Sequence, residues 1–143
     1  MPNPVAMPTD MEITPAQAWK MLAEVGSARL VDVRTEPEWS YVGVPVLDEL
    51  GKTVFNNSWH VFPEMKVNDG FVDELCRFVG PDNVLIFICR SGGRSLAAAT
   101  ASVRAGFQIC YSIAGGFEGG LDVRGHRGAL GGWKFEGLPW KQS

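Results

Sequence analysis

Short apolar runs and helical patterns alternate along this chain. The run 84–88 is continuously apolar and rich in β-branched residues, which predicts a strand buried on both faces. Turn residues at 81–83 precede it, and a glycine-containing loop follows. Comparable runs predict four more strands: an edge strand starting at Ile13, 29–33, a stretch of 54–62 around 59–61, and 108–113.

Helical patterns fill most of the gaps between these strands. The clearest is the first, because Thr14 to Gln17 fits a capping box with Pro15 at the first helical position. We therefore expect a helix over 16–25 that ends at Gly26. The segment 36–50 is expected to be a loop with a short helix near Glu38.

Two later helices are predicted from their apolar faces. The segment 71–79 presents two adjacent faces, Phe71 with Leu75 and Phe78, and Val72 with Cys76 and Val79. This spacing places Cys76 in the core. The segment 96–104 follows Ser95, a suitable N-cap, and carries an apolar face made by Leu96, Ala99, Val103 and Phe107.

Strands that alternate with helices predict an α/β fold. We expect an open, largely parallel five-stranded sheet with helices on both faces and right-handed crossovers. Ligands bind at the carboxyl ends of the strands in such sheets. Cys89 and the segment 32–34 both follow predicted strands, so we expect them near one edge of the sheet.

Composition narrows the classes of protein. With 143 residues, 45% of them hydrophobic, the chain suits a single domain over 1–143 with a core of about 11–141. We expect 1–10 to be flexible and 119–143 to form a glycine-rich C-terminal extension. The net charge of −3, without a lysine or arginine run, argues against a nucleic-acid partner.

The chain lacks signals for membranes, secretion and metals. No apolar stretch approaches the roughly 20 residues that span a bilayer, and the first residues lack a basic start and an apolar core. Three cysteines without a Cys-x-x-Cys pair fit a reducing compartment, so a cytoplasmic location is expected. His60 and His126 have no partners at zinc-ligand spacing, so no metal site is predicted.

Cys89 is the strongest candidate for chemistry. It follows the buried strand and precedes two glycines and a helix, so that loop N–H groups and the helix N-terminus point at one spot. Arg90 and Arg94 add positive charge, and we expect a substantial thiolate fraction at neutral pH. A thiolate is the nucleophilic form, whereas the simpler alternative is a buried cysteine that only ends a strand. The flanking residues favour the reactive interpretation.

Three ordered motifs resemble those of the single-domain rhodaneses, which are sulfurtransferases. The hexapeptide 89–94 resembles their active-site loop, and 30–39 is similar to their first signature, a strand ending in Asp-x-Arg before an acidic stretch and an aromatic residue. Residues 114–117 and 137–139 resemble the closing signature. The resemblance thus spans about residues 11–141 and implies a rhodanese-like fold.

The chain departs from this pattern at two places. The family usually has Gly-His-Ile-Pro after the first signature, whereas 42–45 reads Val-Gly-Val-Pro and lacks the histidine before Pro45. Where an alanine-tryptophan pair is common, the chain has 119–121 and then a glycine-rich stretch, 122–132, before Trp133. These changes concern substrate choice more than the type of reaction.

The resemblance implies an enzyme that needs no cofactor. Sulfur from a small anionic donor such as thiosulfate would be carried as a Cys89 persulfide to cyanide, a thiol or a protein acceptor. Arg90 and Arg94 would bind the donor and the departing sulfite, while Asp32 and Arg34 would support the architecture. The remaining candidate residues are those of the loop, Ser91, Gly92, Gly93 and Ser95, with the serines as caps or as donors to sulfur.

Other functions remain open from the sequence. A phosphatase or arsenate reductase would use a similar cradle, but tyrosine-type phosphatases place one residue more between cysteine and arginine than the four of 90–93. A non-catalytic rhodanese-like binding module is the second alternative. Cys110 is expected to be structural, although a resolving thiol is an alternative. The tail 125–133 is either a lid or docking surface, or a loop anchored to the core by Trp133 and Trp140, which we favour.

Overall fold

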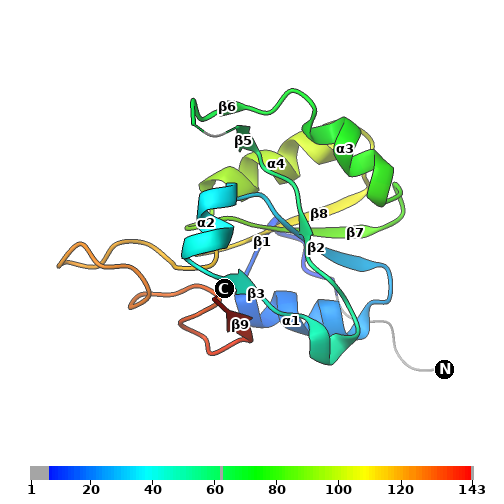
Figure 1. Ribbon diagram of the computed structural model, residues 1–143. Coiled ribbons are helices and arrows are strands. Elements are labelled where there is room, and N and C mark those ends of the chain that lie inside the picture. Colours follow the sequence, from blue (N-terminus) through cyan, green and yellow to red (C-terminus); the bar gives the residue numbers. More distant parts are fainter. Residues whose placement is uncertain (1–6, 62, 143) are drawn as a thin grey trace.

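The central sheet has the predicted parallel arrangement. The structure, a computed structural model, describes residues 7–61 and 63–142. Five parallel strands form one sheet in the order β1-β8-β7-β2-β4 (Figure 1). Their bounds are β1 (Glu12–Ile13), β2 (Ala28–Asp32), β4 (Phe55–Asn56), β7 (Val84–Ile88) and β8 (Ile109–Ile113).

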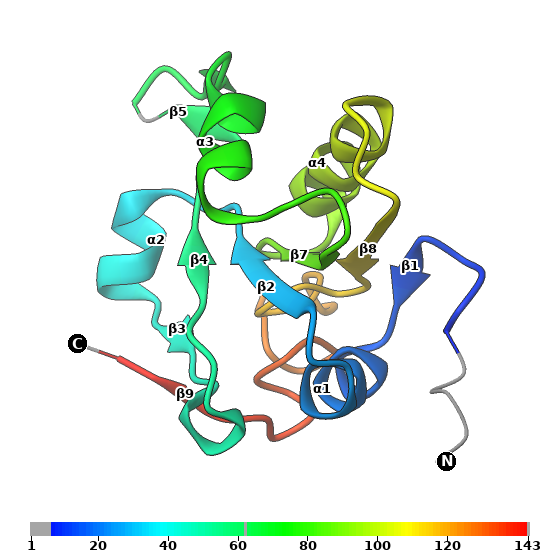
Figure 2. The ribbon, with the colours of Figure 1, turned by 90° about the vertical axis from the view of Figure 1, so that its right-hand side faces the viewer.

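Helices cover both faces of this sheet, as predicted. α1 (Pro15–Glu24) lies on one face, and α3 (Phe71–Phe78) and α4 (Gly93–Arg104) lie on the other (Figures 1 and 2). The capping box at the start of α1 is confirmed, since the Thr14 side chain accepts the Gln17 N–H and the Gln17 side chain accepts the Thr14 N–H. α2 (Glu36–Tyr41), the short helix expected near Glu38, follows β2 directly, and a 3-10 helix, η1, spans Asp48–Leu50.

Two small antiparallel pairs flank the sheet. β3 (Val44–Pro45) pairs with β9 (Trp140–Lys141), and β5 (His60–Val61) pairs with β6 (Lys66–Val67). The strand expected around 59–61 is present as β5, but it lies outside the central sheet, where β4 (Phe55–Asn56) is the strand that joins β2. The apolar character of Trp59 reflects packing instead: its ring contacts that of Phe71 edge-on at 5.2 Å.

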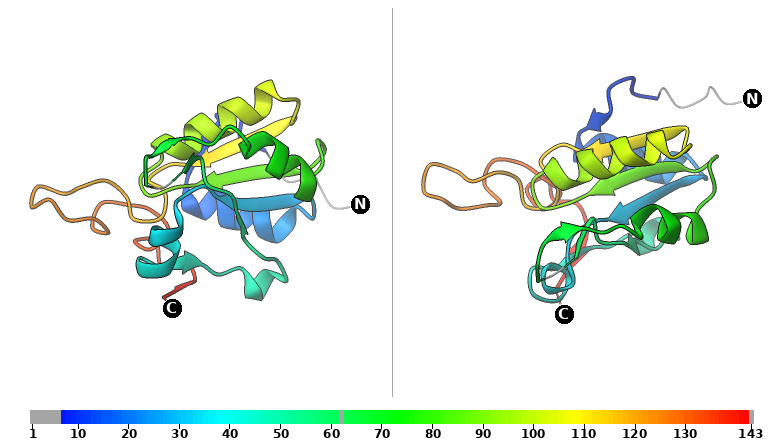
Figure 3. Two further views of the ribbon diagram at one scale, coloured as in Figure 1. Left: turned by 45° about the horizontal axis from the view of Figure 1, so that its top comes forward. Right: turned by 90° about the horizontal axis from the view of Figure 1, so that it is seen from above.

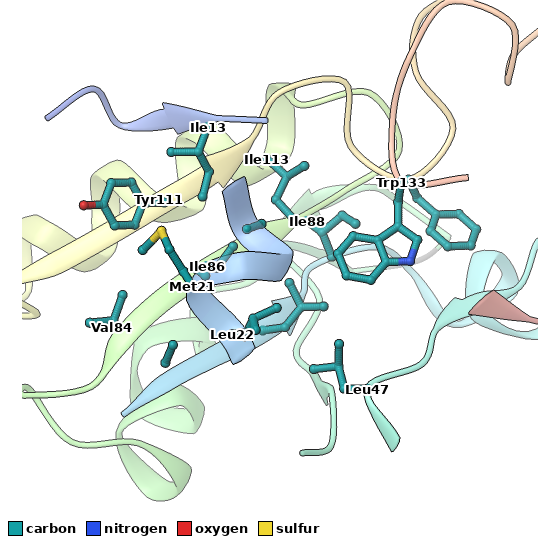
Figure 4. Close-up of a cluster of buried hydrophobic side chains, with 14 residues drawn as sticks. Ile13, Met21, Leu22, Leu47, Val84, Ile86, Ile88, Tyr111, Ile113 and Trp133 are labelled. Carbon is teal, nitrogen blue, oxygen red and sulfur yellow. The ribbon is translucent and has the colours of Figure 1, made fainter. Parts of the chain in front are cut away.

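The sheet separates two apolar clusters. Along β7, Val84, Ile86 and Ile88 face the α1 side, whereas Leu85 and Phe87 face α3 and α4, as the alternation of side chains in a strand requires. Figure 4 shows the first cluster, in which Trp133 from the C-terminal segment packs beside side chains of α1 and the sheet. Every residue of β7 is buried, which confirms the prediction from its continuous apolar run.

The start of α4 differs from the prediction, and its predicted apolar face is confirmed only in part, since Ala99 and Phe107 are buried. Gly92, in the left-handed region at φ 116°, occupies the N-cap position, and Ser95 lies in the first turn. Ser95 therefore does not cap the helix, because its side chain is buried toward the sheet. The residues that α4 buries are Ser95, Ala98, Ala99 and Ser102. Small side chains lie here because the helix packs against β7 and β8, whereas Val103 is exposed.

The predicted core position of Cys76 is also wrong. Phe71 and Leu75 are the buried residues of α3, whereas Cys76 and Phe78 are exposed. Of the second apolar face predicted for this helix, Cys76 alone is exposed, because Val79 is buried and Val72 packs against the same cluster. Phe78 still contacts the ring of Phe55 at a centroid distance of 4.6 Å.

The described N-terminal residues and the C-terminal segment both form hydrogen bonds with the rest of the domain. The expected flexibility of 1–10 falls partly on residues 1–6, which lie outside the described residues. Pro8 is described, and its carbonyl accepts a hydrogen bond from the Tyr111 hydroxyl. The segment after Gly119 extends away from the domain body before it returns to β9 (Figure 3). Within 7–61 and 63–142, none of the helices is both long and apolar enough to cross a membrane.

Candidate functional site

Cys89 lies at the carboxyl end of β7, at the first position of the loop that leads into α4. Its side chain shares the cluster on the α3 and α4 face of the sheet, and the residue is only 1% exposed. The loop is short, because the helix begins at Gly93. Strand, loop and helix therefore converge on the thiol as the sequence predicts.

Two hydrogen-bonding groups contact the sulfur. The Gly92 N–H donates to Cys89 Sγ at 3.1 Å, and the Ser95 hydroxyl lies 3.3 Å from the same atom. The first contact requires the left-handed conformation of Gly92, which a residue with a side chain adopts only with strain. The sulfur thus sits where an N–H and a hydroxyl can both stabilise negative charge.

The Ser95 hydroxyl belongs to a small buried network. Its oxygen lies 2.7 Å from the hydroxyl oxygen of Ser112 on β8 and 3.1 Å from the carbonyl oxygen of Gly92, a second acceptor within reach of its proton. The Ser112 hydroxyl also lies 3.4 Å from that carbonyl. Ser112 was not identified from the sequence. No local signal in the sequence links it to Ser95, because the contact depends on the pairing of β8 with β7.

The Arg94 side chain is held by Glu38 of α2. The two side chains form a bidentate ion pair, with distances of 2.6 and 2.9 Å. Glu38 also accepts hydrogen bonds from the Thr35 N–H and the Thr35 hydroxyl. Burial raises the pKa of Glu38, but the Arg94 hydrogen bond and charge, with Thr35, outweigh burial and hold the pKa below 4.5.

The same ion pair affects Arg94. The hydrogen bond to Glu38 is the main cause that raises the pKa of Arg94 above its usual range, against the opposing effect of burial. The charges of Glu38, Cys89 and Asp32 act in the same direction as the hydrogen bond. Arg94 therefore contributes a positive charge near the sulfur while its guanidinium is committed to α2. Glu38 appears in the sequence only as part of the first signature, and no spacing rule pairs it with a residue 56 positions later.

Asp32 and Arg34 form a second ion pair, which is fully buried. Arg34 Nη2 donates to Asp32 Oδ2 at 2.7 Å and to the Gly43 carbonyl at 2.7 Å, and Nε also contacts the carboxylate. The guanidinium lies over the Phe117 ring at 4.4 Å. Asp32 pairs in register with Ile88, so this ion pair is next to the end of β7, and it links β2 to the β3 region and to Phe117.

The other loop residues lie at the surface of the site. Arg90, Ser91 and Gly93 are exposed, so the structure places one positively charged side chain at the mouth of the loop and a second, Arg94, behind it. Two pockets of about 460 Å³ flank this region. One lies beside α2, between Trp39 and His60, and the other follows α4 from Gly93 to Arg104.

The double glycine of the closing motif, Gly115 and Gly116, packs directly on the loop that begins at Cys89. The Phe117 N–H donates to the Cys89 carbonyl at 2.8 Å, and the Glu118 N–H donates to the Arg90 carbonyl at 2.9 Å. A Cβ atom at Gly116 would overlap the backbone of Cys89 and Arg90, so this close approach requires glycine.

The C-terminal segment continues the same backbone contacts outward. The Trp133 N–H donates to the Gly116 carbonyl at 2.8 Å, and the Lys134 N–H donates to the Phe117 carbonyl at 3.1 Å. The Trp133 ring is fully buried and donates from Nε1 to the Pro139 carbonyl. Anchoring by Trp133 is therefore confirmed. Trp140 is 39% exposed and packs edge-on against Phe117.

The described part of the chain offers no cluster of three or more metal-ligating side chains. Cys110 is buried on β8, and burial raises the pKa of its thiol to about 12. Cys76, the remaining thiol, lies on the exposed side of α3. Among the described cysteines, Cys89 alone therefore has an N–H and a hydroxyl directed at its sulfur.

Comparison with known proteins gives consistent matches. A family model for the Rhodanese-like domain matches residues 14–122. The uncharacterized protein RP600 of Rickettsia prowazekii is 36% identical over 131 residues, which cover 90% of this chain and 95% of that protein. The thiosulfate sulfurtransferase GlpE of Haemophilus influenzae is 31% identical over 110 residues, covering 76% and 85% of the two chains.

Solved structures agree with these matches. The crystal structure of Rv0390 from M. tuberculosis superposes with a TM-score of 0.85 at 47% sequence identity, covering 92% of this chain and 97% of that one. The fold of this chain is thus a known architecture. This chain belongs to the rhodanese-like family.

Proposed function

We propose that the protein is a sulfurtransferase that moves sulfane sulfur from a small anionic donor to a thiophilic acceptor through a Cys89 persulfide. The observation that carries this proposal is the environment of the sulfur. The Gly92 N–H and the Ser95 hydroxyl both contact Cys89 Sγ in a loop with four residues between Cys89 and Arg94. Membership of the rhodanese-like family and distant similarity to thiosulfate sulfurtransferases support it.

The first half-reaction needs only the donor and the thiolate. The Cys89 thiolate attacks the outer sulfur of thiosulfate, so that a new S–S bond forms while the S–S bond of the donor breaks. Sulfite leaves with the bonding electron pair, and the persulfide retains the negative charge of the original thiolate. Charge and atoms balance without an oxidant, a reductant or a proton.

The second half-reaction regenerates the enzyme. A thiolate or cyanide attacks the outer persulfide sulfur, forms a bond to it and releases the Cys89 thiolate. The products are then a new persulfide or thiocyanate. Cys89 must remain reduced between cycles, which favours a reducing compartment such as the cytoplasm.

The surrounding charges suit an anionic donor. Arg90 is exposed at the mouth of the loop, where its guanidinium can bind the sulfonate oxygens of thiosulfate and the departing sulfite. Arg94 is bidentate to Glu38, so its contribution is a fixed positive charge close to the site instead of a movable ligand. Because Cys89 is only 1% exposed, the site favours a donor that presents a single terminal sulfur.

Intact mass spectrometry after incubation with thiosulfate tests this proposal. We expect the wild type to gain the mass of one sulfur atom and Cys89→Ser to gain none. The variant keeps Cys76, which is exposed, and Cys110, which is buried, so it controls for sulfur at the other thiols. Addition of cyanide to the loaded wild type should remove the added mass and yield thiocyanate.

Two outcomes would contradict the proposal. If the wild type gains no sulfur from thiosulfate, polysulfide or another persulfide donor, the domain acts as a binding module. If Cys89 supports turnover of a phosphate ester, the argument that four residues between Cys89 and Arg94 make too small a loop for a phosphoryl group is wrong.

A further inference from the structure

We propose that Ser112 is a positioning residue of this site, which acts through Ser95 to direct a hydroxyl proton onto the sulfur of Cys89. The inference rests on the proposed sulfur transfer for its role in turnover. The geometry itself concerns only the reactivity of the thiol. Ser112 does not touch the sulfur, so its effect has to pass through Ser95.

Sheet register brings Ser112 to the site. Ser112 pairs with Phe87 of β7, and side chains two positions apart in a strand share one face. Cys89 follows Phe87 by two positions, so Ser112 and Cys89 face the same side of the sheet, beneath the first turn of α4. Both serine side chains are completely buried, at 0% exposure.

The number of protons in the network makes Ser112 important. Ser95 has one hydroxyl proton and three neighbouring acceptors: Cys89 Sγ at 3.3 Å, the Gly92 carbonyl at 3.1 Å and Ser112 Oγ at 2.7 Å. At 2.7 Å, one serine must donate to the other. If Ser95 donates to Ser112, its proton is used and the sulfur keeps only the Gly92 N–H.

Donation in the opposite direction, from Ser112 to Ser95, leaves a proton that can stabilise the sulfur. When Ser112 donates to Ser95, the Ser95 proton is left for Cys89 Sγ or for the Gly92 carbonyl. That carbonyl already accepts the Leu96 N–H at 3.1 Å, whereas a thiolate or persulfide anion attracts a donor more strongly than a neutral carbonyl does. An anionic sulfur therefore favours the chain Ser112 to Ser95 to Cys89, in which each bond polarises the next.

The reactivity of Cys89 with iodoacetamide tests this role without any sulfur donor. Peptide mass mapping separates Cys89 from the exposed Cys76. We expect Ser112→Ala to slow Cys89 alkylation and persulfide formation from thiosulfate, each by roughly 3- to 10-fold, through the loss of one hydrogen bond. The apparent KM for thiosulfate should stay unchanged, because Ser112 does not contact the donor.

Ser102→Ala is the matched control. Ser102 is equally buried, and its hydroxyl donates to the Ala98 carbonyl at 2.8 Å within α4. We expect its alkylation rate to stay within twofold of the wild-type rate, about the effect expected for a change that removes no bond near the sulfur. A comparable loss in Ser102→Ala would show that general loosening of α4 causes the effect.

A second pair of variants separates the hydroxyl from packing. Threonine and valine have nearly the same shape, but only threonine keeps the hydroxyl. Ser112→Thr should therefore retain most of the reactivity that Ser112→Val loses. If both variants fail to fold, a double-mutant cycle with Ser95→Ala decides: Ser112→Ala should have little further effect on a chain that already lacks the Ser95 hydroxyl.

The proposal is overturned if Ser112→Ala reacts at the wild-type rate, if Ser112→Val matches Ser112→Thr, or if the effects of Ser95→Ala and Ser112→Ala multiply. Failure of the proposed function looks different. In that case the wild type gains no sulfur from any donor, while the alkylation rates of the variants still report on the contact between Ser112, Ser95 and Cys89.

Discussion

Asp32 and Arg34 show how a charged pair is maintained inside a small core. Both side chains are completely buried, and the guanidinium bonds the carboxylate, the Gly43 carbonyl and the face of Phe117. Removing two charges from water is costly, so the pair persists because each charge satisfies the other. Its position beside the end of β7 gives it a structural role in holding the β3 region and Phe117 around the site.

Because this ion pair is buried, we expect a conservative substitution of Asp32 to lower the stability of the fold strongly. Asp32→Asn keeps the shape of the side chain but leaves the Arg34 charge buried without its counterion. We expect the free energy of unfolding to fall by about 3–5 kcal/mol, measured by urea denaturation with an unchanged m-value.

An exposed ion pair provides the control for that substitution. Glu74 and Arg77 on α3 lie 3.9 Å apart, with 77% of the Arg77 side chain and 44% of the Glu74 side chain exposed. Glu74→Gln should change stability by less than about 1 kcal/mol. A change of similar size in both variants would contradict the argument that burial makes the Asp32 charge important.

The ion pair between α2 and α4 links two elements that are distant in sequence. Arg94 is near the start of α4, and Glu38 lies in the short helix that follows β2. The pair therefore fixes the N-terminus of α4 relative to α2. Because the loop of Cys89 ends at this helix start, the position of the loop depends on contacts between α2 and α4.

A pH-dependent stability follows from this pair. The pKa of Glu38 is below its ordinary 4.5 in the folded state, so in acid the unfolded chain binds a proton more readily than the folded one. The stabilisation by Glu38 is complete above about pH 4.5 and is lost as the pH falls through the lower folded value. Glu38→Gln should therefore be less stable than the wild type at pH 7, and the difference should shrink below pH 4.5.

Thermal unfolding between pH 3 and pH 7 measures this difference. Glu36→Gln is the control, because Glu36 lies exposed in the same helix and makes no ion pair with Arg94 among the described contacts. If the stability difference between wild type and Glu38→Gln stays constant across this pH range, the ion pair with Arg94 does not contribute as described.

At this scale, the sequence predicts strands better than helix faces. The run 84–88 is a buried strand, as its β-branched residues predict, and Thr14 fixes the start of α1 through a side-chain hydrogen bond. The buried face of α4 was harder to predict, because close packing against the sheet selects small residues such as Ala98 and Ser102 over the larger Val103. Hydrophobicity alone cannot express that steric preference.

The residues of the site also divide into those that local sequence predicts and those that it does not. Cys89 and its loop were predicted because one short segment contains all the signals: a strand end, glycines and arginines. Glu38 and Ser112 were not assigned roles, because their contacts to Arg94 and Ser95 depend on which elements are neighbours in space. Sheet order and register supply that information, and neither is encoded in local spacing.

At the scale of the whole molecule, the C-terminal segment 119–142 is bonded to the rest of the domain at both of its ends. Backbone hydrogen bonds run from the loop at Cys89 to Phe117 and from there to Lys134. β9 then pairs with β3, next to the Gly43 carbonyl that Arg34 binds. The middle of the segment is different: Leu121, Val123 and Leu130 are exposed there.

The buried Trp133 ring anchors this closure, and its removal tests how far the domain depends on it. The ring contacts Trp19 of α1 edge-on at 5.9 Å, and its Nε1 donates to the Pro139 carbonyl at 2.7 Å. Trp133→Ala should lower the free energy of unfolding by about 3–5 kcal/mol, because it leaves a large cavity in the cluster around α1.

Phe135→Ala is the comparison for this substitution, since Phe135 is an aromatic residue of the same segment with 54% of its surface exposed. It should change stability by less than about 1 kcal/mol. If Trp133→Ala kept the stability of the wild type and lost only transfer to a thiol acceptor, Trp133 would serve recognition. Because the Trp133 ring is buried in the core, we expect its removal to weaken folding first. Any loss of sulfur transfer would then follow from disorder of the double glycine that packs on the loop of Cys89.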